Sequence, residues 1–321
     1  MSDMSSVRQR KRVVVGDIHG ELEGLTEILE NAGLIDDGGA WTGEDAILIQ
    51  TGDVVDRGPS SREALHFLGR LQKEAAIAGG EVVRLCGNHE LMLLQGYYGY
   101  ASYEHPGSLA SELKEEIAKG NVLASFTDGT RLYTHAGLRS AVRETIVGDI
   151  KKGHSGLGPE TSGLLLLSDR INAIFRKAVR GGFKEQHPIF YVGRDRGGRD
   201  PVGGIFWCDF SSITPSEEAY IIPQVFGHTP TGKAGVETAR GLSLIDVDAG
   251  MCRFYGGKRV YLEITPDGRL LEHGRKLDKW AGRALDEAVC PVCGWKLEDA
   301  PSGTWCVNPD CAVLDDADNY K

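Results

Sequence analysis

The sequence AILIQTGDVVDRG spans residues 46–58 and opens with a short, mostly apolar run. A run of this length that is bounded by turn residues is typical of a strand covered on both faces of its sheet. The run ends at Gly52, which lets the backbone come close to whatever Asp53 holds. Asp56 and Arg57 follow a few residues later. The stretch therefore predicts a buried strand that delivers two carboxylates and a guanidinium to a loop.

Four other apolar runs end at polar residues of the same kinds. They cover residues 12–15, 81–85, 131–134 and 219–226, and they lead into GDIHG, GNHE, HAG and GHTP. Open α/β sheets bind ligands outside the carboxyl ends of their strands, so we expect the polar residues to meet in one site. The expected metal ligands are Asp17, His19, Asp53, Asn88, His135 and His228.

The donor types of these six residues limit the ions that they would bind. Carboxylate, amide and imidazole donors without a thiolate suit Mn, Fe, Zn or Mg, and not a closed structural zinc site. Six ligands are too many for one open catalytic ion, and the Asp53 carboxylate can bridge two ions. We therefore expect two divalent ions, with Mn favoured, roughly 3.5 to 4 Å apart, a spacing that suits hydrolysis of a phosphate ester.

The segments between the first motifs have helical patterns. Residues 21–31 carry apolar side chains at a helical period, and residues 60–78 do the same after a proline. Strand, loop and helix thus alternate through the first third of the chain, which is the pattern of an α/β domain. We also expect a helix over residues 164–179 and strands over residues 243–247 and 258–264, the last followed by a hairpin turn.

The motifs GDIHG, GDVVDRG and GNHE, in this order, resemble the signature blocks of the phosphoprotein phosphatase branch of the calcineurin-like metallophosphoesterases. The resemblance covers roughly residues 12–265 and implies a four-layer α/β sandwich. It also implies that the bridging Asp53 belongs to both metal sites. Asp17 and His19 would complete one site, and Asn88, His135 and His228 the other.

The same resemblance implies catalytic roles for three further residues. His89 would be the general acid, Asp56 would orient it, and Arg57 would bind phosphate oxygens. The chemistry agrees, because a hydroxide between two cations is a nucleophile at neutral pH, metal binding lowering the pKa of water to about 7 in favourable cases. A histidine beside a carboxylate suits proton transfer to the leaving group, and a guanidinium meets phosphoryl charge with two hydrogen bonds.

Three functional hypotheses follow. The leading one is a phosphoprotein phosphatase that acts on phosphoserine, phosphothreonine or phosphotyrosine. The alternative enzyme is a dinucleoside tetraphosphate hydrolase, because similar motif blocks serve that reaction. A third hypothesis, a non-catalytic binding scaffold with a structural metal site, predicts a damaged acid or missing ligands. His89, Asp56 and every ligand position are occupied, which argues against the scaffold.

Two segments outside the motifs have open interpretations. Residues 181–204 are rich in glycine and carry Arg194 and Arg196, which either close over substrate phosphate or belong to a solvated linker. Residues 97–100 read YYGY and either wall the substrate cleft or pack the insert onto the domain, and we favour packing.

Two acidic segments late in the chain receive no role from the sequence. Trp207-Cys208-Asp209 is similar to a Trp-Ser-Asp segment near the active site of the family, but the cysteine in place of serine weakens a specific role for Asp209. Asp246-Val-Asp248 is similar to an aspartyl-phosphate nucleophile pair, but its late position and its following residue argue against that chemistry.

The bulk properties of the chain narrow its class. A net charge of −10 argues against general nucleic-acid binding, which needs an excess of Lys and Arg. No apolar stretch approaches the roughly 20 residues that span a bilayer. Residues 1–10 are polar and are expected to be disordered, without the apolar core of an export signal. We therefore expect a soluble, cytoplasmic protein without a membrane partner, whose substrate is a phosphorylated protein or a nucleotide.

Four cysteines near the end of the chain predict a small zinc ribbon. Each pair forms a short knuckle, and the two pairs have a spacing close to that of a four-thiolate site. We expect a metallophosphoesterase catalytic domain over residues 11–275 and a ribbon over residues 286–321, which offers a docking site for a protein partner. The structural zinc ligands are expected to be Cys290, Cys293, Cys306 and Cys311.

Overall fold

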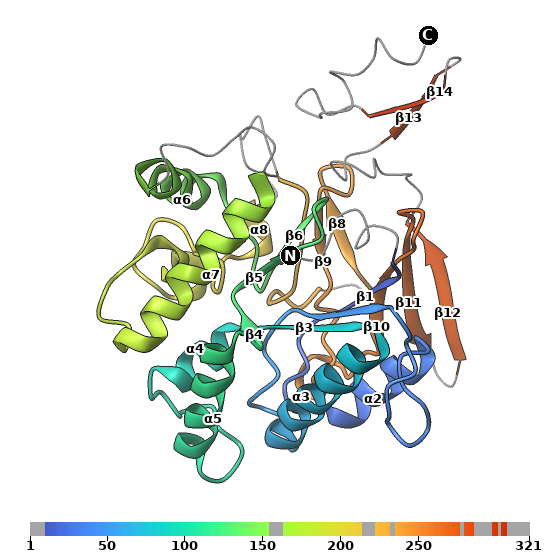
Figure 1. Ribbon diagram of the computed structural model, residues 1–321, viewed down its shortest axis with the longest axis horizontal. Helices are drawn as coiled ribbons and strands as arrows, with labels where there is room; N and C mark the ends of the chain where they lie inside the picture. Colours follow the sequence, from blue (N-terminus) through green and yellow to red (C-terminus); the bar gives the residue numbers. More distant parts are fainter. Residues whose placement is uncertain are drawn as a thin grey trace.

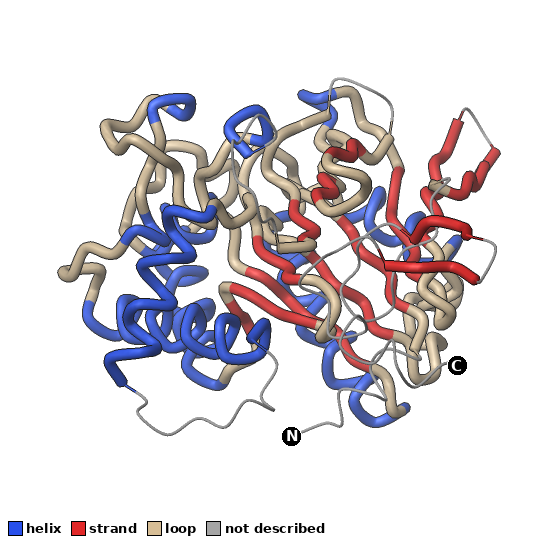
Figure 2. The backbone as a smooth tube through the Cα atoms, turned by 90° about the horizontal axis from the view of Figure 1, so that it is seen from above, coloured by secondary structure: helices blue, strands red, loops and turns tan. Residues whose placement is uncertain are grey.

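The computed structural model describes residues 10–153, 163–213, 222–231, 235–276, 279–285, 297–300 and 303–306. Within these ranges two sheets lie face to face, and helices cover the outer face of each sheet (Figures 1 and 2). This arrangement confirms the expected four-layer α/β sandwich.

The larger sheet has seven strands, with the first strand of the chain at its centre. This strand and the three strands on one side of it run parallel, and the three strands on its other side pair antiparallel. In spatial order the strands are β12 (Lys279–Ala284), β11 (Leu270–Lys276), β10 (Val260–Ile264), β1 (Arg12–Val15), β2 (Ile47–Gln50), β3 (Glu81–Leu85) and β4 (Val122–Leu123).

Alternate side chains of the central strands pack into two different cores. Val13 and Val15 of β1 pack with the buried faces of two helices, α2 (Leu22–Asn31) and α3 (Ser61–Ala78). Val14 points the other way, into the core between the two sheets. Period-2 alternation with both faces apolar is the reason that these runs form buried strands.

The smaller sheet has five strands and faces the larger one through residues such as Tyr133, Val225 and Ile245. Its three central strands run parallel, so their carboxyl ends point the same way. In spatial order the strands are β5 (Ser125–Thr127), β6 (Leu132–Thr134), β7 (Gln224–Phe226), β9 (Leu244–Asp246) and β8 (Glu237–Ala239).

Four of the remaining helices form a separate apolar core that also includes Leu132 of β6, whereas the fifth, α8 (Phe210–Ile213), packs in a smaller cluster with Phe226 of β7. Ile117, Ile146 and Phe175 are fully or almost fully buried in the separate core. Its helices are α4 (Asn88–Leu94), α5 (Pro106–Lys119), α6 (Ser140–Gly153) and α7 (Gly163–Gly181), and the 3-10 turns are η1 (Pro188–Phe190), η2 (Arg194–Arg196) and η3 (Arg253–Tyr255).

The structure differs from the expected elements in three places. The strand expected over residues 219–226 is only Gln224–Phe226, because Pro223 lacks the N–H that a ladder needs and residues 219–221 lie outside the described ranges. The larger sheet continues to Ala284, past the residue 275 at which the sequence placed the domain end. Helix α6 was not expected from the sequence.

The two terminal segments, for which the sequence predicted a disordered start and a zinc ribbon, lie mostly outside the described residues. Residues 1–9 and three of the four ribbon cysteines, Cys290, Cys293 and Cys311, are among them. The described part is a hairpin of β13 (Leu297–Ala300) and β14 (Gly303–Cys306), in which Leu297 pairs with Cys306. The zinc ribbon stays a prediction. In the described part of the chain, no helix has the length and apolarity needed to cross a membrane.

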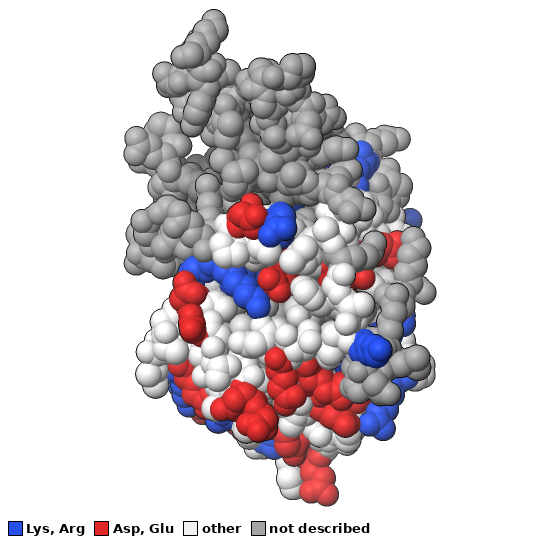
Figure 3. Space-filling view, turned by 90° about the vertical axis from the view of Figure 1, so that its right-hand side faces the viewer, with Lys and Arg blue, Asp and Glu red and all other residues white. Residues whose placement is uncertain are grey.

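The described surface carries both signs of charge. On the face drawn in Figure 3, Asp and Glu side chains form the larger patches in the lower part, with Lys and Arg side chains around them. This distribution is in keeping with the net charge of −10.

Candidate active site

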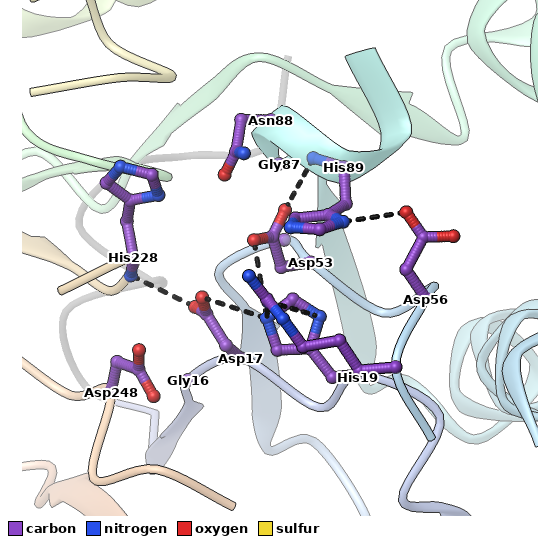
Figure 4. Close-up of polar contacts among 12 residues, drawn as sticks. Gly16, Asp17, His19, Asp53, Asp56, Gly87, Asn88, His89, His228 and Asp248 are labelled. Atoms are coloured by element: carbon purple, nitrogen blue, oxygen red, sulfur yellow. Dashed lines mark hydrogen bonds and ion pairs between the residues drawn. The ribbon is translucent and has the colours of Figure 1, made fainter. Parts of the chain in front are cut away.

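The six expected ligand residues lie together at the carboxyl ends of five strands, three of which run parallel in one sheet and two in the other. The ends of β1, β2 and β3 supply residues from the larger sheet, and the ends of β6 and β7 supply residues from the smaller one. Figure 4 shows how the side chains of Asp17, His19, Asp53, Asn88 and His228 surround a common centre. The structure therefore brings together every residue that the strand ends predicted: Asp17, His19, Asp53, Asn88, His135 and His228.

Asp53 stands between two groups of donors. Its Oδ2 atom lies 3.6 Å from Nε2 of His19, and its Oδ1 atom lies 3.6 Å from Nε2 of His135. Asp17 Oδ2 lies 4.0 Å from the same His19 nitrogen, which places it on the first side. Asn88 Oδ1 and His228 Nδ1 lie 3.0 and 3.1 Å from Nε2 of His135, on the second side. Each carboxylate oxygen of Asp53 thus faces a different group.

Backbone contacts set which ring nitrogen of each histidine faces the centre. Nδ1 of His19 is 2.9 Å from the carbonyl oxygen of Val55, and Nδ1 of His135 is 3.0 Å from that of Thr51. When Nδ1 donates its proton to a carbonyl, Nε2 keeps a free lone pair, as a metal ligand requires. Burial lowers the pKa of His19 to about 3 and lowers the pKa of His135 and His228, so all three rings are neutral near pH 7.

The site fits divalent cations in its charge as well as in its donors. Burial together with Asp248 and Asp53 raises the pKa of Asp17 well above its usual value. The Nε2 atom of His228 is buried without a hydrogen-bond partner. Two sets of buried donors, His19 with Asp53 and His89, and Asp53 with His135 and His228, have ligand atoms close enough to share an ion. Cations would neutralise the facing carboxylates.

His89 and Asp56 form a buried pair beside these donors. Nδ1 of His89 lies 2.7 Å from Asp56 Oδ2, and the His89 backbone N–H donates to Asp53 Oδ1 at 2.9 Å. Burial alone would lower the pKa of His89, but the charge of Asp53 and the hydrogen bond to Asp56 outweigh it and raise that pKa. The ring is therefore held in one orientation and is kept ready to carry a proton.

Arg57 lies across the opening of the donor cluster. Its guanidinium contacts the ring of His19 and stacks over the ring of Tyr255, 5.2 Å from the ring centroid. The N–H groups of the guanidinium that do not face His19 can bind a planar or tetrahedral anion.

The loops that carry these residues have a strained backbone. His19, Asp53, Asp56, Arg57 and His228 all have positive φ, between 47° and 75°, a region that non-glycine residues rarely adopt. Such conformations persist where surrounding contacts hold them.

Glu90 supplies such contacts for the loop after β2. Its buried carboxylate accepts the backbone N–H groups of Asp53, Val54 and Val55 at 2.8, 2.8 and 3.0 Å. It also accepts the N–H of Gly87 at 2.7 Å, in its own loop. One side chain thus joins the loop that carries Asp53 to the start of α4, which carries His89.

The structure gives a second reason for a glycine at position 52. Its φ is +105°, and a Cβ there would lie 2.5 Å from the backbone nitrogen of Gly87. The glycine therefore lets the segments that carry Asp53 and Gly87 approach each other.

The donor residues line a cleft of about 310 Å³, and aromatic side chains form part of its walls. Tyr97 and Tyr100 line it and remain 56% and 53% exposed, so the packing role that we favoured for them is wrong. Trp207 and Tyr255 line other parts of the same cleft.

Of the two arginines expected from the glycine-rich segment, only Arg196 lines the cleft, whereas Arg194 is exposed elsewhere. The Arg196 guanidinium is fixed by an ion pair of 2.9 Å with Asp209 and a hydrogen bond of 2.6 Å to Thr229. Asp209 thus has a positioning contact that the sequence did not indicate.

Asp248 lines the cleft beside Asp17 and was missed (Figure 4). Its backbone follows β9, and its Oδ1 accepts the N–H of Gly250 at 3.0 Å. Burial, with a smaller contribution from Asp53, raises the pKa of Asp248 to about 7. A signal was available, since Asp248 follows an apolar strand in the same way as the predicted ligands do.

Comparisons with known proteins agree with this geometry. The model of the family described as "Calcineurin-like phosphoesterase" matches residues 11–230. An uncharacterized protein of Schizosaccharomyces pombe is 32% identical over 275 residues, which cover 78% of this chain and 76% of that protein. Shewanella-like protein phosphatase 2 of Arabidopsis thaliana is 41% identical over 95 residues, but these cover only 30% of this chain and 24% of that protein.

Among solved structures, a cold-active protein-tyrosine phosphatase of a psychrophilic Shewanella species superposes with a TM-score of 0.63. The match covers 88% of this chain and 84% of that one, at 23% sequence identity. At this identity the likeness shows a shared fold.

Proposed function

The chain belongs to the calcineurin-like phosphoesterase family, and from this premise we propose that it is a dinuclear-metal phosphoprotein phosphatase acting on phosphoserine, phosphothreonine or phosphotyrosine. The observation that carries the proposal is the position of Asp53, whose two oxygens face two separate donor groups beside the His89–Asp56 pair. The similarity of part of the chain to a relative named as a protein phosphatase supports the substrate class.

The proposed cofactors are two divalent ions, with Mn favoured and Fe, Zn or Mg as alternatives. When bound, the ions would offset phosphate charge and lower the pKa of water enough to supply a nucleophile at neutral pH. Asp17, His19 and Asp53 would hold one ion, and Asp53, Asn88, His135 and His228 the other.

The chain's own residues would handle the phosphate and the leaving group. Arg57 and Arg196 line the same cleft, and we propose that both bind phosphoryl oxygens. His89 would donate a proton to the leaving oxygen, and Asp56 would hold the ring in the required orientation.

A dinucleoside tetraphosphate hydrolase is the second candidate, and one observation favours it. The exposed rings of Tyr97 and Tyr100 lie 5.9 Å apart at the cleft, where they could stack on a nucleobase as readily as on a peptide side chain.

Phosphate release by metal-stripped, Mn-reconstituted protein would distinguish the two candidates. A phosphopeptide library and diadenosine tetraphosphate are compared at equal concentration. We expect the peptides to turn over much faster. Faster turnover of the dinucleotide would reject the phosphoprotein assignment, while the same metal ligands and the same acid would be retained.

We also propose that Cys290, Cys293, Cys306 and Cys311 hold one structural zinc. Replacing Cys290 with Ser in the full chain should lower the zinc content by about one ion per chain and leave turnover unchanged. An unchanged zinc content would reject the ribbon, and a loss of turnover would show that it is coupled to the catalytic domain.

A further inference from the structure

The segment between α4 and α5 lies against the proposed general acid. The ring of Tyr100 is 5.4 Å from the ring of His89. The Ser102 hydroxyl donates to the carbonyl oxygen of Gly58 at 2.8 Å, which fixes the segment to the loop that carries Asp56. Tyr103, the next residue, is partly buried and packs against the helical core. The segment is therefore in position to act on the His89–Asp56 pair.

One buried acceptor on Asp56 and one buried donor on Tyr103 have no hydrogen-bond partner in the structure. Asp56 Oδ2 contacts His89, but Asp56 Oδ1 is buried without a partner. The hydroxyl of Tyr103 is also buried without a partner. Buried polar atoms are nearly always paired, because an unpaired one loses its contacts with water and gains nothing in return. A hydrogen bond between the buried hydroxyl and the buried carboxylate oxygen would satisfy both atoms.

The properties of the Tyr103 hydroxyl agree with a donor role. Burial, followed by the charge of Asp56 and hydrogen bonding to it, raises the pKa of Tyr103. The phenol therefore keeps its proton over the physiological range, and the group that acts on it most strongly after burial is the Asp56 carboxylate.

We propose that the Tyr103 hydroxyl donates a hydrogen bond to Asp56 Oδ1 and thereby positions Asp56 for its contact with His89. Tyr103 is a positioning residue, since it touches neither the substrate nor a metal. The inference rests on the proposed function, because it assigns a purpose to the pair only if His89 protonates a leaving group.

A fixed carboxylate matters at this position for a structural reason. Asp56 has a φ of 70°, so its backbone is not held in a relaxed conformation. Without Tyr103 the carboxylate could rotate about its χ2 torsion, which is broad for aspartate, and the His89 ring would lose its fixed orientation. The defect should fall on proton donation and should spare metal binding.

The test compares two aryl phosphates whose leaving groups differ in their need for a proton. A nitrophenolate leaves readily, whereas a phenolate benefits from protonation. Turnover of p-nitrophenyl phosphate and phenyl phosphate is measured for the Mn-reconstituted full-length protein and for Tyr103→Phe. Tyr98→Phe is the matched control, because Tyr98 is 42% exposed and is not among the residues that line the cleft. His89→Asn shows how large the loss is when the acid itself is removed.

We expect Tyr103→Phe to lower kcat for phenyl phosphate by about tenfold to 100-fold, the effect of losing one hydrogen bond to a charged group. Its kcat for p-nitrophenyl phosphate, its KM and its metal content should change little, and Tyr98→Phe should match the parent protein. Equal losses on both substrates, a loss of metal, or no loss at all would each overturn the inference. If the parent protein releases phosphate from neither substrate, or if His89→Asn spares both, the proposed function fails first and the inference fails with it.

Discussion

Replacing Asp128 with Asn removes one half of a buried ion pair that joins the two sheets. Asp128 lies on the turn between β5 and β6, and its Oδ2 atom is 3.0 Å from Nη1 of Arg12 at the start of β1. Strand β1 leads to Asp17, and β6 leads to His135. The pair therefore helps to set the relative position of the two halves of the site.

The structure bounds the energy of this change. The Asp128 side chain is fully buried, and that of Arg12 is only 3% exposed. Leaving a buried charge without its partner typically costs about 3–5 kcal/mol. In the variant Arg12 would keep its bond to the carbonyl oxygen of Thr265 at 3.2 Å, so we expect a loss near the lower end, about 3 kcal/mol.

Acid should remove the same stabilisation from the parent protein. Burial would raise the pKa of Asp128, but Arg12 and the hydrogen bonds from Thr130 and Arg131 lower it below its ordinary value of 3.8. Because the folded pKa lies below the unfolded one, the stabilisation is complete above pH 3.8 and is lost as the pH falls through the folded pKa. The difference in the free energy of unfolding between the parent protein and Asp128→Asn should therefore narrow only below pH 3.8.

The assay is urea unfolding of the metal-free chain, with Asp267→Asn as the control. Asp267 pairs with Arg269 at the same distance of 3.0 Å, but both side chains are more than 60% exposed. We expect no measurable shift for the control. A loss below about 1 kcal/mol for Asp128→Asn, the range of an exposed pair, would refute the reasoning.

Two further predictions concern the site itself. Asp53→Asn should lower the metal content at both donor groups, since one carboxylate faces both, and elemental analysis that still finds two ions per chain would contradict the bridging role. Arg196→Lys should raise the KM for a phosphopeptide by about tenfold to 100-fold, because a hydrogen bond to a charged group is lost, whereas Arg194→Lys should leave it unchanged. Equal KM values for the two arginine variants would remove Arg196 from the phosphate site.

The strands that carry the site could be predicted because their signals are local. Short apolar runs that stop at motif residues placed β1, β2, β3 and β6 within a residue or so of their observed bounds. The gathering of the six donors followed from one topological rule, that parallel strands deliver their carboxyl ends to one edge.

Apart from Asp248, which had a local signal outside the motif blocks, the rest depends on contacts that no local pattern records. Tyr97 and Tyr100 line the same cleft as Arg196 and Tyr255, which lie far along the chain. Asp248 follows a strand as the ligands do, but it belongs to no motif block. The positioning role of Asp209 follows from its ion pair with Arg196, and the sequence could not indicate that pair because the two residues belong to separate segments.

The most direct test of the central claim is a titration of Mn into metal-stripped protein while phosphate release from a phosphotyrosine peptide is followed. Two donor groups that share Asp53 predict that turnover stays near background after the first equivalent of ion and rises with the second. The rise should be absent in Asp53→Asn. Full turnover without metal, or at one ion per chain, would contradict a dinuclear phosphatase.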